Sequence, residues 1–242
     1  ELKGEFKDKN AVLVAAGPSL DKNVELLKRL PENTLIVAVG TVFRKLMNLG
    51  IVPDYVVFLD AQTRNIRQIE ELGNSEVPII IASTATKQIG IDYREKKYLV
   101  CQYGYDRAEL YASEHGYQLY ETGGSVSTIM LDICIRLGCQ EIAFIGLDLA
   151  FTGGRSHSND TLDNHAVSSD EENCEVLSWN GDILKTSKLF LIYKEWMERR
   201  AMQEDAQGKL IDATEGGAHI EHWRKETLKN VLEQWEKKDC SV

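Results

Sequence analysis

The chain has 242 residues, of which 43% are hydrophobic and 27% are charged, and its formal net charge is −10. The acidic balance argues against nucleic acid as a partner, because a phosphate backbone is bound by clustered Lys and Arg, and no apolar run is long enough to predict a membrane span. The five cysteines form no CxxC pair and no zinc-ligand spacing, which favours a cytoplasmic protein.

The first half of the chain repeats one unit, a short apolar run followed by a helical pattern. Residues 11–17 (AVLVAAG) precede a helical spacing of apolar residues over 18–30, and the same unit recurs over 34–50 and 54–73. A further apolar run begins at 77–83. Continuous apolar runs that alternate with helices predict a parallel sheet buried on both faces.

The second half contains a more distinctive unit. Residues 117–121 (YQLYE) predict a strand, and residues 122–128 read TGGSVST at the start of an amphipathic helix. The apolar positions of that helix are Val126, Ile129, Met130, Ile133, Cys134 and Leu137. Gly138 is expected to end the helix in a left-handed conformation, and residues 141–151 (EIAFIGLDLAF) resume the sheet.

A long polar loop is predicted from Thr152 to Cys174, followed by helices over 187–202 and 220–238 around a strand at 209–214. We therefore predict one α/β domain over residues 1–242, a Rossmann-like, open and mostly parallel sheet flanked by helices, with C-terminal helices over about 187–242. Because the chain begins with Glu1 rather than Met, we also expect it to be a domain excised from a longer protein.

Glycine and hydroxyl residues follow several strands at the edge where parallel sheets bind ligands. At the starts of helices, glycines allow close backbone approach, and amides with hydroxyls favour an anion such as a phosphate. The candidate ligands are Gly17, Pro18, Ser19, Gly40, Thr41, Gly123, Gly124, Ser125 and Ser127. The alternative is that these stretches only form tight turns and N-caps. Neither a Walker loop nor a full GxGxxG fingerprint is present.

Acidic, basic and histidine candidates lie at the same edge. Asp60 and Asp148 end strands, where each could bind a hydroxyl, a base or a metal, or could instead be a helix N-cap. His157 and Arg155 lie in the polar loop directly after the Asp148 strand. We expect this loop to move and to close over a ligand, whereas the alternative makes His157 a solvated loop residue.

A family resemblance runs from Val12 to about Ile220 and rests on five segments: GPSLD, DYVVFLDAQ, TGGSVSTIMLDICIRLGCQEIAFIGLDLAFTGGRSHS, GDILKTSKLFLIYKEWMERR and LIDATEGGAHI. Together they resemble the central domain of the motility-associated factor (Maf) flagellin glycosyltransferases, the DUF115 or MptE-like family. The same domain is similar to bacterial sialyltransferases. The resemblance implies transfer of a sialic-acid-like sugar, pseudaminic or legionaminic acid, from a CMP donor to Ser or Thr of flagellin.

On this reading the TGGSVST stretch, Gly17–Ser19, Gly40, Thr41, Asp60 and Arg155 bind the donor, and no cofactor or metal is needed. His157 is the first choice for the base that takes the acceptor proton, and Asp148 is the second. Archaeal 6-hydroxymethylpterin pyrophosphokinases share the domain, so the main alternative is an ATP-dependent diphosphotransferase with Mg²⁺ on Asp60 and Asp148. A module that binds a nucleotide or an acceptor without catalysis is the third possibility.

Overall fold

The computed structural model describes residues 2–62, 66–73, 75–155, 157–161 and 174–239. The strands of its main sheet are β1 (Asn10–Val14), β2 (Thr34–Val39), β3 (Tyr55–Phe58), β4 (Ile79–Ala82), β5 (Lys97–Gln102), β6 (Leu119–Tyr120), β7 (Ile142–Ile145), β10 (Leu210–Asp212) and β11 (Arg224–Lys225). Two further strands, β8 (Cys174–Leu177) and β9 (Ile183–Thr186), form an antiparallel hairpin.

The α-helices are α1 (Leu2–Phe6), α2 (Leu20–Asn23), α3 (Phe43–Asn48), α4 (Ile66–Leu72), α5 (Lys87–Asp92), α6 (Asp106–His115), α7 (Val126–Leu137), α8 (Lys188–Ala201) and α9 (Leu228–Asp239). Short 3-10 helices are η1 (Val24–Arg29), η2 (Gly40–Val42) and η4 (Thr152–Gly154). Within the described ranges, none of these helices has the length and apolar character that crossing a bilayer requires.

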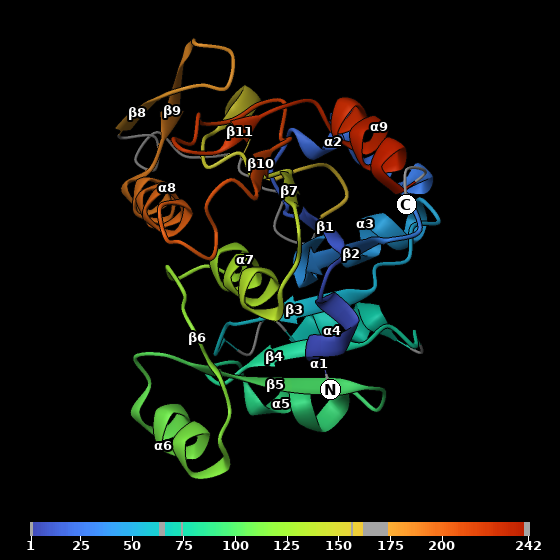
Figure 1. Ribbon diagram of the computed structural model, residues 1–242, viewed down its shortest axis with the longest axis vertical. Helices are drawn as coiled ribbons and strands as arrows, with labels where there is room; N and C mark the ends of the chain where they lie inside the picture. Colours follow the sequence, from blue (N-terminus) through green and yellow to red (C-terminus); the bar gives the residue numbers. More distant parts are fainter. Residues whose placement is uncertain (1, 63–65, 74, 156, 162–173, 240–242) are drawn as a thin grey trace.

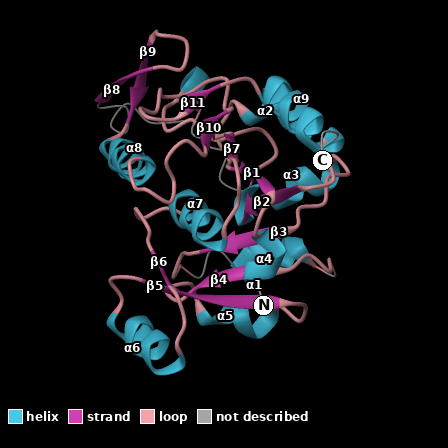
Figure 2. Cartoon of the chain, in the orientation of Figure 1, coloured by secondary structure: helices cyan, strands magenta, loops and turns pink. Residues whose placement is uncertain are grey.

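The nine strands of the main sheet lie in the order β11-β10-β7-β1-β2-β3-β4-β5-β6, and each neighbouring pair is parallel (Figure 2). Every residue of β1, β2, β3 and β7 is buried, as expected for central strands covered on both faces. The predicted Rossmann-like α/β fold with a parallel sheet is confirmed.

The strand order reverses between β1 and β7. Strands β2 to β6 continue from β1 in one direction, whereas β10 and β11 extend beyond β7 in the other. The loops that leave the carboxyl ends of β1 and β7 therefore diverge and open a crevice, the usual ligand position in an open parallel sheet.

Helices cover the two faces of the sheet unequally around this crevice. In Figure 1, α7 and α8 lie on one side of the central strands, and α2, α3 and α9 lie on the other. Helix α7 packs against β1, β2, β3 and β7, so its first turn reaches the crevice although the preceding strand β6 lies at the edge of the sheet. Gly138 ends α7 in the predicted left-handed conformation, with φ of 92°.

A buried ion pair fixes α8 against α7. The Arg200 guanidinium donates to Asp132 Oδ1 at 2.7 Å, and both side chains are at most 1% exposed. A second hydrogen bond of 2.7 Å joins Arg200 to Asp205 beyond the end of α8. Breaking a buried pair by removing one partner is strongly destabilising, so this pair holds α8 beside α7.

Several elements differ from the sequence predictions. The predicted helix over 18–30 is divided into α2 and η1, and residues 97–115, for which no element was predicted, contain β5 and α6. The predicted helix over 220–238 begins only at Leu228, because Thr227 Oγ1 accepts the amide of Asn230 at 3.3 Å and the chain before it forms β11.

Candidate functional site

A cavity of about 420 Å³ opens at the carboxyl ends of the central strands. Its walls come from the loops after β1, β2, β3 and β7, from the first turn of α7 and from helices α4, α5 and α8. The lining residues are Ala15, Ala16, Gly17, Val39, Gly40, Thr41, Phe58, Leu59, Asp60, Gln68, Ile89, Gly124, Ser125, Val126, Ser127, Gly146, Leu147, Asp148, Leu149, Ala150, His157, Phe190 and Tyr193. The predicted residues that do not line it are Pro18, Ser19, Gly123 and Arg155.

The start of α7 is built around Thr128. Ser125 is the N-cap and its hydroxyl accepts the Thr128 amide at 3.3 Å. Thr128 Oγ1 in turn accepts the amides of Gly123 at 2.9 Å and Ser125 at 3.2 Å, and Thr122 Oγ1 accepts the amide of Gly124 at 3.1 Å. The amides of the two glycines and of Ser125 are therefore satisfied within the turn.

The next two amides of α7, those of Val126 and Ser127, have no acceptor among the described residues. Both residues line the cavity. The first amides of a helix carry the positive end of its dipole and bind anions readily. Within the TGGSVST stretch, the amides of Val126 and Ser127 are therefore available to an anion, whereas those of Gly123 and Gly124, three residues earlier, are not.

The two glycines of this turn have different surroundings. A Cβ on Gly123 would come within 2.5 Å of the Trp196 ring, so this glycine serves packing against α8 rather than ligand contact. Gly124 has a φ of +99°, and a Cβ there would meet the Tyr193 ring at 3.3 Å. Both glycines were predicted to contact the ligand, but of the two only Gly124 lines the cavity.

The turn after β1 is closed by Asp148, which follows β7. The amide of Ser19 donates to Asp148 Oδ2 at 3.1 Å and its hydroxyl donates to the same oxygen at 2.5 Å. Thr152 Oγ1 donates to Asp148 Oδ1 at 2.7 Å. Ser19 is fully buried, so its predicted role in binding the donor does not match its position, because its polar groups bind Asp148 instead.

Close packing around Asp148 explains the neighbouring glycines. A Cβ on Gly17 would lie 2.1 Å from Asp148 Oδ2, and one on Gly217 would lie 2.3 Å from the Asp148 backbone. Leu149 has a φ of +47°, a strained value for a residue with a side chain. Burial raises the pKa of Asp148, although the hydrogen bonds from Ser19 and Thr152 oppose that rise.

A second buried carboxyl lies nearby at the end of β10. Burial is the main cause that raises the pKa of Asp212 to about 7; the charge of Asp148 contributes to the rise, and hydrogen bonds from Thr214 oppose it. Thr214 Oγ1 also accepts the amide of Leu147 at 3.3 Å. Asp212 was not among the predicted site residues, since a single acid within the predicted strand LIDAT gives no signal of this proximity.

The wall of the cavity beside β2 and β3 includes the polar side chains of Gln68 and Asp60. Gly40 lies so close to Gln68 that a Cβ would come within 2.1 Å of its Oε1 atom. Asp60 is exposed and lines the cavity, and burial together with the charge of Asp60 raises the pKa of Tyr193. Gln68 and Tyr193 were not predicted, because each lies on a helix whose sequence shows only ordinary periodicity.

The loop after β7 brings His157 to the cavity, as predicted. Arg155 points elsewhere: its guanidinium donates to Asn159 Oδ1 at 2.6 Å and lies 3.7 Å from Asp21 Oδ2. Residues 162–173 of the predicted loop lie outside the described residues, and the expected closing motion of the loop stays a prediction.

The lining of the cavity contains the acidic residues Asp60 and Asp148. Among the described residues it contains no Lys or Arg. The α7 amides and the helix dipole are therefore groups of this lining that suit an anion. No cluster of three or more His, Cys, Asp or Glu side chains suited to a metal occurs in the described part of the chain.

Comparison with known proteins gives a family and a fold. The family model described as "6-hydroxymethylpterin diphosphokinase MptE-like" matches residues 1–154, more than half of the chain. The chain belongs to this family. No curated protein sequence matches the chain.

Among solved structures, the chain is similar to the Maf glycosyltransferase from Magnetospirillum magneticum AMB-1, with a TM-score of 0.74 and 19% sequence identity. The likeness covers 97% of this chain and 37% of that one, so the chain spans little more than a third of the length of that protein. At this identity the two share a fold. The resemblance to the MptE-like and Maf proteins inferred from the sequence is confirmed.

Proposed function

We propose that this chain is a glycosyltransferase that moves a nonulosonic acid, such as pseudaminic or legionaminic acid, from a CMP donor to Ser or Thr of flagellin. One observation carries the proposal. The amides of Val126 and Ser127, at the start of the twelve-residue helix α7, face a cavity at the point where the strand order reverses. A CMP-nonulosonate offers a phosphate and a carboxylate, and either anion suits these amides.

The fold of the MptE-like family, seen also in a Maf glycosyltransferase, supports the same class of reaction. In the proposed reaction the acceptor hydroxyl oxygen forms a bond to the anomeric carbon while the bond from that carbon to the phosphate oxygen breaks. CMP leaves with the electron pair, and the transition state has oxocarbenium character. His157 takes the proton of the acceptor hydroxyl as general base.

Asp148 is less suited to be the base than His157. Its two oxygens accept from Ser19 and Thr152 at 2.5 to 3.3 Å, so the carboxylate is already held by the protein. We propose that Asp148 supports the turn after β1, and that His157, which lines the cavity further along the same loop after β7, takes the proton.

The family description favours a second candidate, a diphosphotransferase that passes pyrophosphate from ATP to a 6-hydroxymethylpterin. Such a reaction uses Mg²⁺ to bridge the phosphates, and Asp60 with Asp148 would be the ligands. Asp60 is exposed and available in the cavity. Asp148 would have to exchange its bonds with Ser19 and Thr152 for the metal, which makes this candidate the weaker one.

One experiment separates the candidates. The 242-residue chain is incubated with a CMP-nonulosonate and unglycosylated flagellin in EDTA, and in parallel with ATP, Mg²⁺ and 6-hydroxymethylpterin. We expect a glycan mass on flagellin in the first reaction, and a turnover that is about 10²-fold lower for His157→Gln with nearly unchanged CMP affinity. AMP formed only in the second reaction would establish the diphosphotransferase, and CMP binding without either product would leave a binding module.

A further inference from the structure

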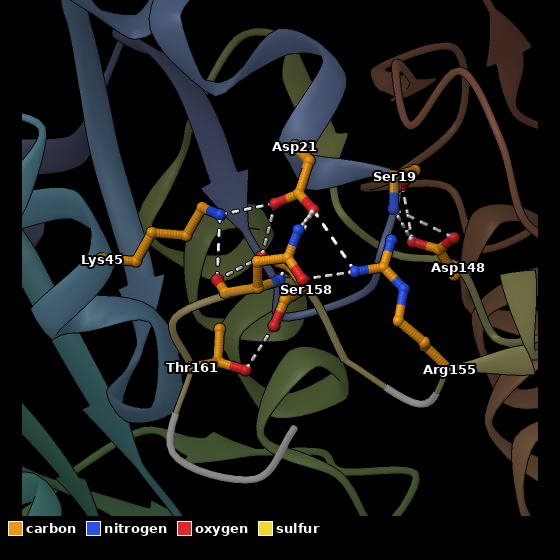
Figure 3. Close-up of polar contacts among 8 residues, drawn as sticks. Ser19, Asp21, Lys45, Asp148, Arg155, Ser158 and Thr161 are labelled. Carbon is orange, nitrogen blue, oxygen red and sulfur yellow. Dashed lines mark hydrogen bonds and ion pairs between the residues drawn. The ribbon is translucent and has the colours of Figure 1, made fainter. Parts of the chain in front are cut away.

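The residue that follows His157 is fixed to the wall of the cavity. Ser158 is fully buried, and its amide donates to the carbonyl of Ala16 at 2.7 Å. Its hydroxyl donates to Asp21 Oδ1 at 3.0 Å (Figure 3). Ala16 and His157 both line the cavity. The backbone at Ser158 is therefore anchored, beside the cavity, to the loop that leaves β1.

Asp21 is the centre of this anchorage. Its carboxylate, in the first turn of α2, also accepts from Lys45 Nζ at 2.5 Å and from Asn159 Nδ2 at 2.9 Å. Arg155 lies 3.7 Å away on the other side (Figure 3). Residues on both sides of His157 in the chain thus converge on one carboxylate.

Lys45 brings a buried positive charge to the same place. The residue is 7% exposed, and its ammonium donates both to Asp21 and to the carbonyl of Asn159 at 3.0 Å. Burial would raise the pKa of Asp21, but the hydrogen bond and the charge of Lys45 outweigh it and lower the pKa. Burying an ammonium costs free energy unless the charge is paired. A buried ion pair is weak evidence of added stability, so the pair of Lys45 and Asp21 is better explained by the single arrangement of these segments that it fixes.

We infer that Asp21 and Lys45 are positioning residues for His157. With Ser158 and Asn159 they form a latch that joins α2, α3 and the loop after β7, and this latch sets where the His157 ring lies in the cavity. The inference rests on the proposed function, in which His157 is the base. No residue of the latch lines the cavity, so the latch touches neither donor nor acceptor; its members are Asp21, Lys45, Ser158 and Asn159.

The simpler reading is that the network only holds α2 to α3. Both readings predict a less stable protein when the pair is broken. They differ in what happens at His157, because a purely structural pair would lower stability without a specific effect on that side chain or on the proton transfer it performs.

The variants are chosen to keep the protein folded. Lys45→Met breaks the pair, and Asp21→Asn combined with Lys45→Met removes both charges without leaving one unpaired. Lys45→Arg restores the positive charge and is the rescue variant. The control is Lys28→Met, which removes an ion pair with Glu25 whose side chains are 44% and 60% exposed.

The first measurement does not depend on turnover. In histidine-labelled protein the NMR signal of the His157 ring is assigned by its absence in His157→Gln. We expect Lys45→Met and the double variant to move and broaden this signal, Lys45→Arg to restore it, and Lys28→Met to leave it unchanged. A His157 signal that stays the same in both latch variants would overturn the inference, whatever reaction the protein catalyses.

The second measurement uses the proposed reaction. We expect the latch variants to lower kcat by about 10-fold or more, with CMP affinity within about threefold of the parent. In a His157→Gln background the same substitutions should have no further effect on kcat, because their effect passes through His157. An equal loss of kcat in both backgrounds would contradict the latch, and a parent without turnover would contradict the proposed function alone, with the NMR signal still deciding the latch.

Discussion

Two turns in this molecule look alike in sequence and differ in where their hydrogen bonds go. The closed turn, Gly17–Ser19 after β1, binds the Asp148 carboxylate through the amide and hydroxyl of Ser19. The open helix start, Ser125–Ser127, keeps the amides of Val126 and Ser127 without an acceptor among the described residues. A glycine and serine turn before a helix therefore predicts an anion site only if its amides are not already occupied by the protein.

The largest expected difference between the two turns comes from their glycines. Gly17→Val should lower the free energy of unfolding by more than about 4 kcal/mol, because its Cβ would meet Asp148 Oδ2 at 2.1 Å and the Gly146 carbonyl at 2.5 Å. Gly124→Val should cost less stability, about 1 to 3 kcal/mol for its φ of +99°, but should abolish donor binding.

Urea denaturation and calorimetry measure the two effects. The control is Gly4→Ala in α1, where a Cβ meets nothing within 4 Å, so the free energy of unfolding should not fall. Equal losses of stability at Gly17 and Gly124 would remove the structural distinction between the closed turn and the open helix start.

A pH dependence should come from the carboxyls around the closed turn. An unfolded aspartate titrates near pH 4, whereas the pKa of folded Asp212 is about 7. Between these values the folded state holds the proton more tightly than the unfolded state, so the free energy of unfolding falls as the pH rises through that range. In Asp212→Asn the decrease in the free energy of unfolding between pH 4 and 7 should be smaller by roughly 2 to 4 kcal/mol.

Urea denaturation of parent and variant at several pH values measures this decrease. The decisive quantity is the difference between the two profiles, because other carboxyls contribute to both. An Asp212→Asn profile that stays parallel to that of the parent would mean that Asp212 has the same pKa in the folded and unfolded states, and would contradict the raised pKa.

The smallest effects distinguish the two serines of the open helix start. Ser125→Ala removes the N-cap acceptor of the Thr128 amide and should cost about 1 kcal/mol of stability. Ser127→Ala should leave stability within about 0.5 kcal/mol of the parent and weaken CMP binding by about fivefold, the size of one hydrogen bond. Thermal unfolding and calorimetry on both variants test this division, and a reversed pattern would contradict it.

The fold was predictable because its signals are local. Runs such as AVLVAAG and TLIVAVG are continuous and apolar, and each becomes a fully buried central strand. The position of β11 and the start of α9 were not predictable from periodicity, since the amphipathic pattern continues through Arg224 and Lys225. Hydrogen bonds mark the helix start instead, from the Asn230 amide to Thr227 Oγ1 and from the Leu228 amide to Glu215 Oε1.

The site was predictable in composition and less so in detail. Gly17, Asp60, Ser127 and His157 reach one cavity because parallel strands bring their carboxyl ends together. Hydrogen-bond partners at the site could not be predicted in this way. Ser19 and Asp148 are 129 positions apart in the chain, and no local pattern pairs them.

Tyr193 shows the same limit. It reaches the cavity because α8 is placed beside α7 by the buried pair of Arg200 and Asp132, two residues 68 positions apart. Within α8 the periodicity identifies a packed face, but it does not reveal which neighbour that face meets. Long-range packing therefore decides which side chains of a helix enter a site.

In the proposed function, the open amides of Val126 and Ser127 bind the anionic donor. Proline at position 126 removes one of these amides and belongs to the first helical position, where it is tolerated. Ser125 before it is extended, with φ of −123° and ψ of 159°, as the residue before a proline requires. Val126→Ala is the matched control, because it shortens the same side chain and keeps the amide.

The most direct measurement is the affinity of CMP for Val126→Pro and for Val126→Ala, determined by calorimetry on protein shown to be folded. We predict that the proline variant binds CMP about tenfold more weakly than the alanine variant, as expected for the loss of a hydrogen bond to a charged group. Equal affinities of the two variants would contradict the account, because the α7 amide would then contribute nothing to binding.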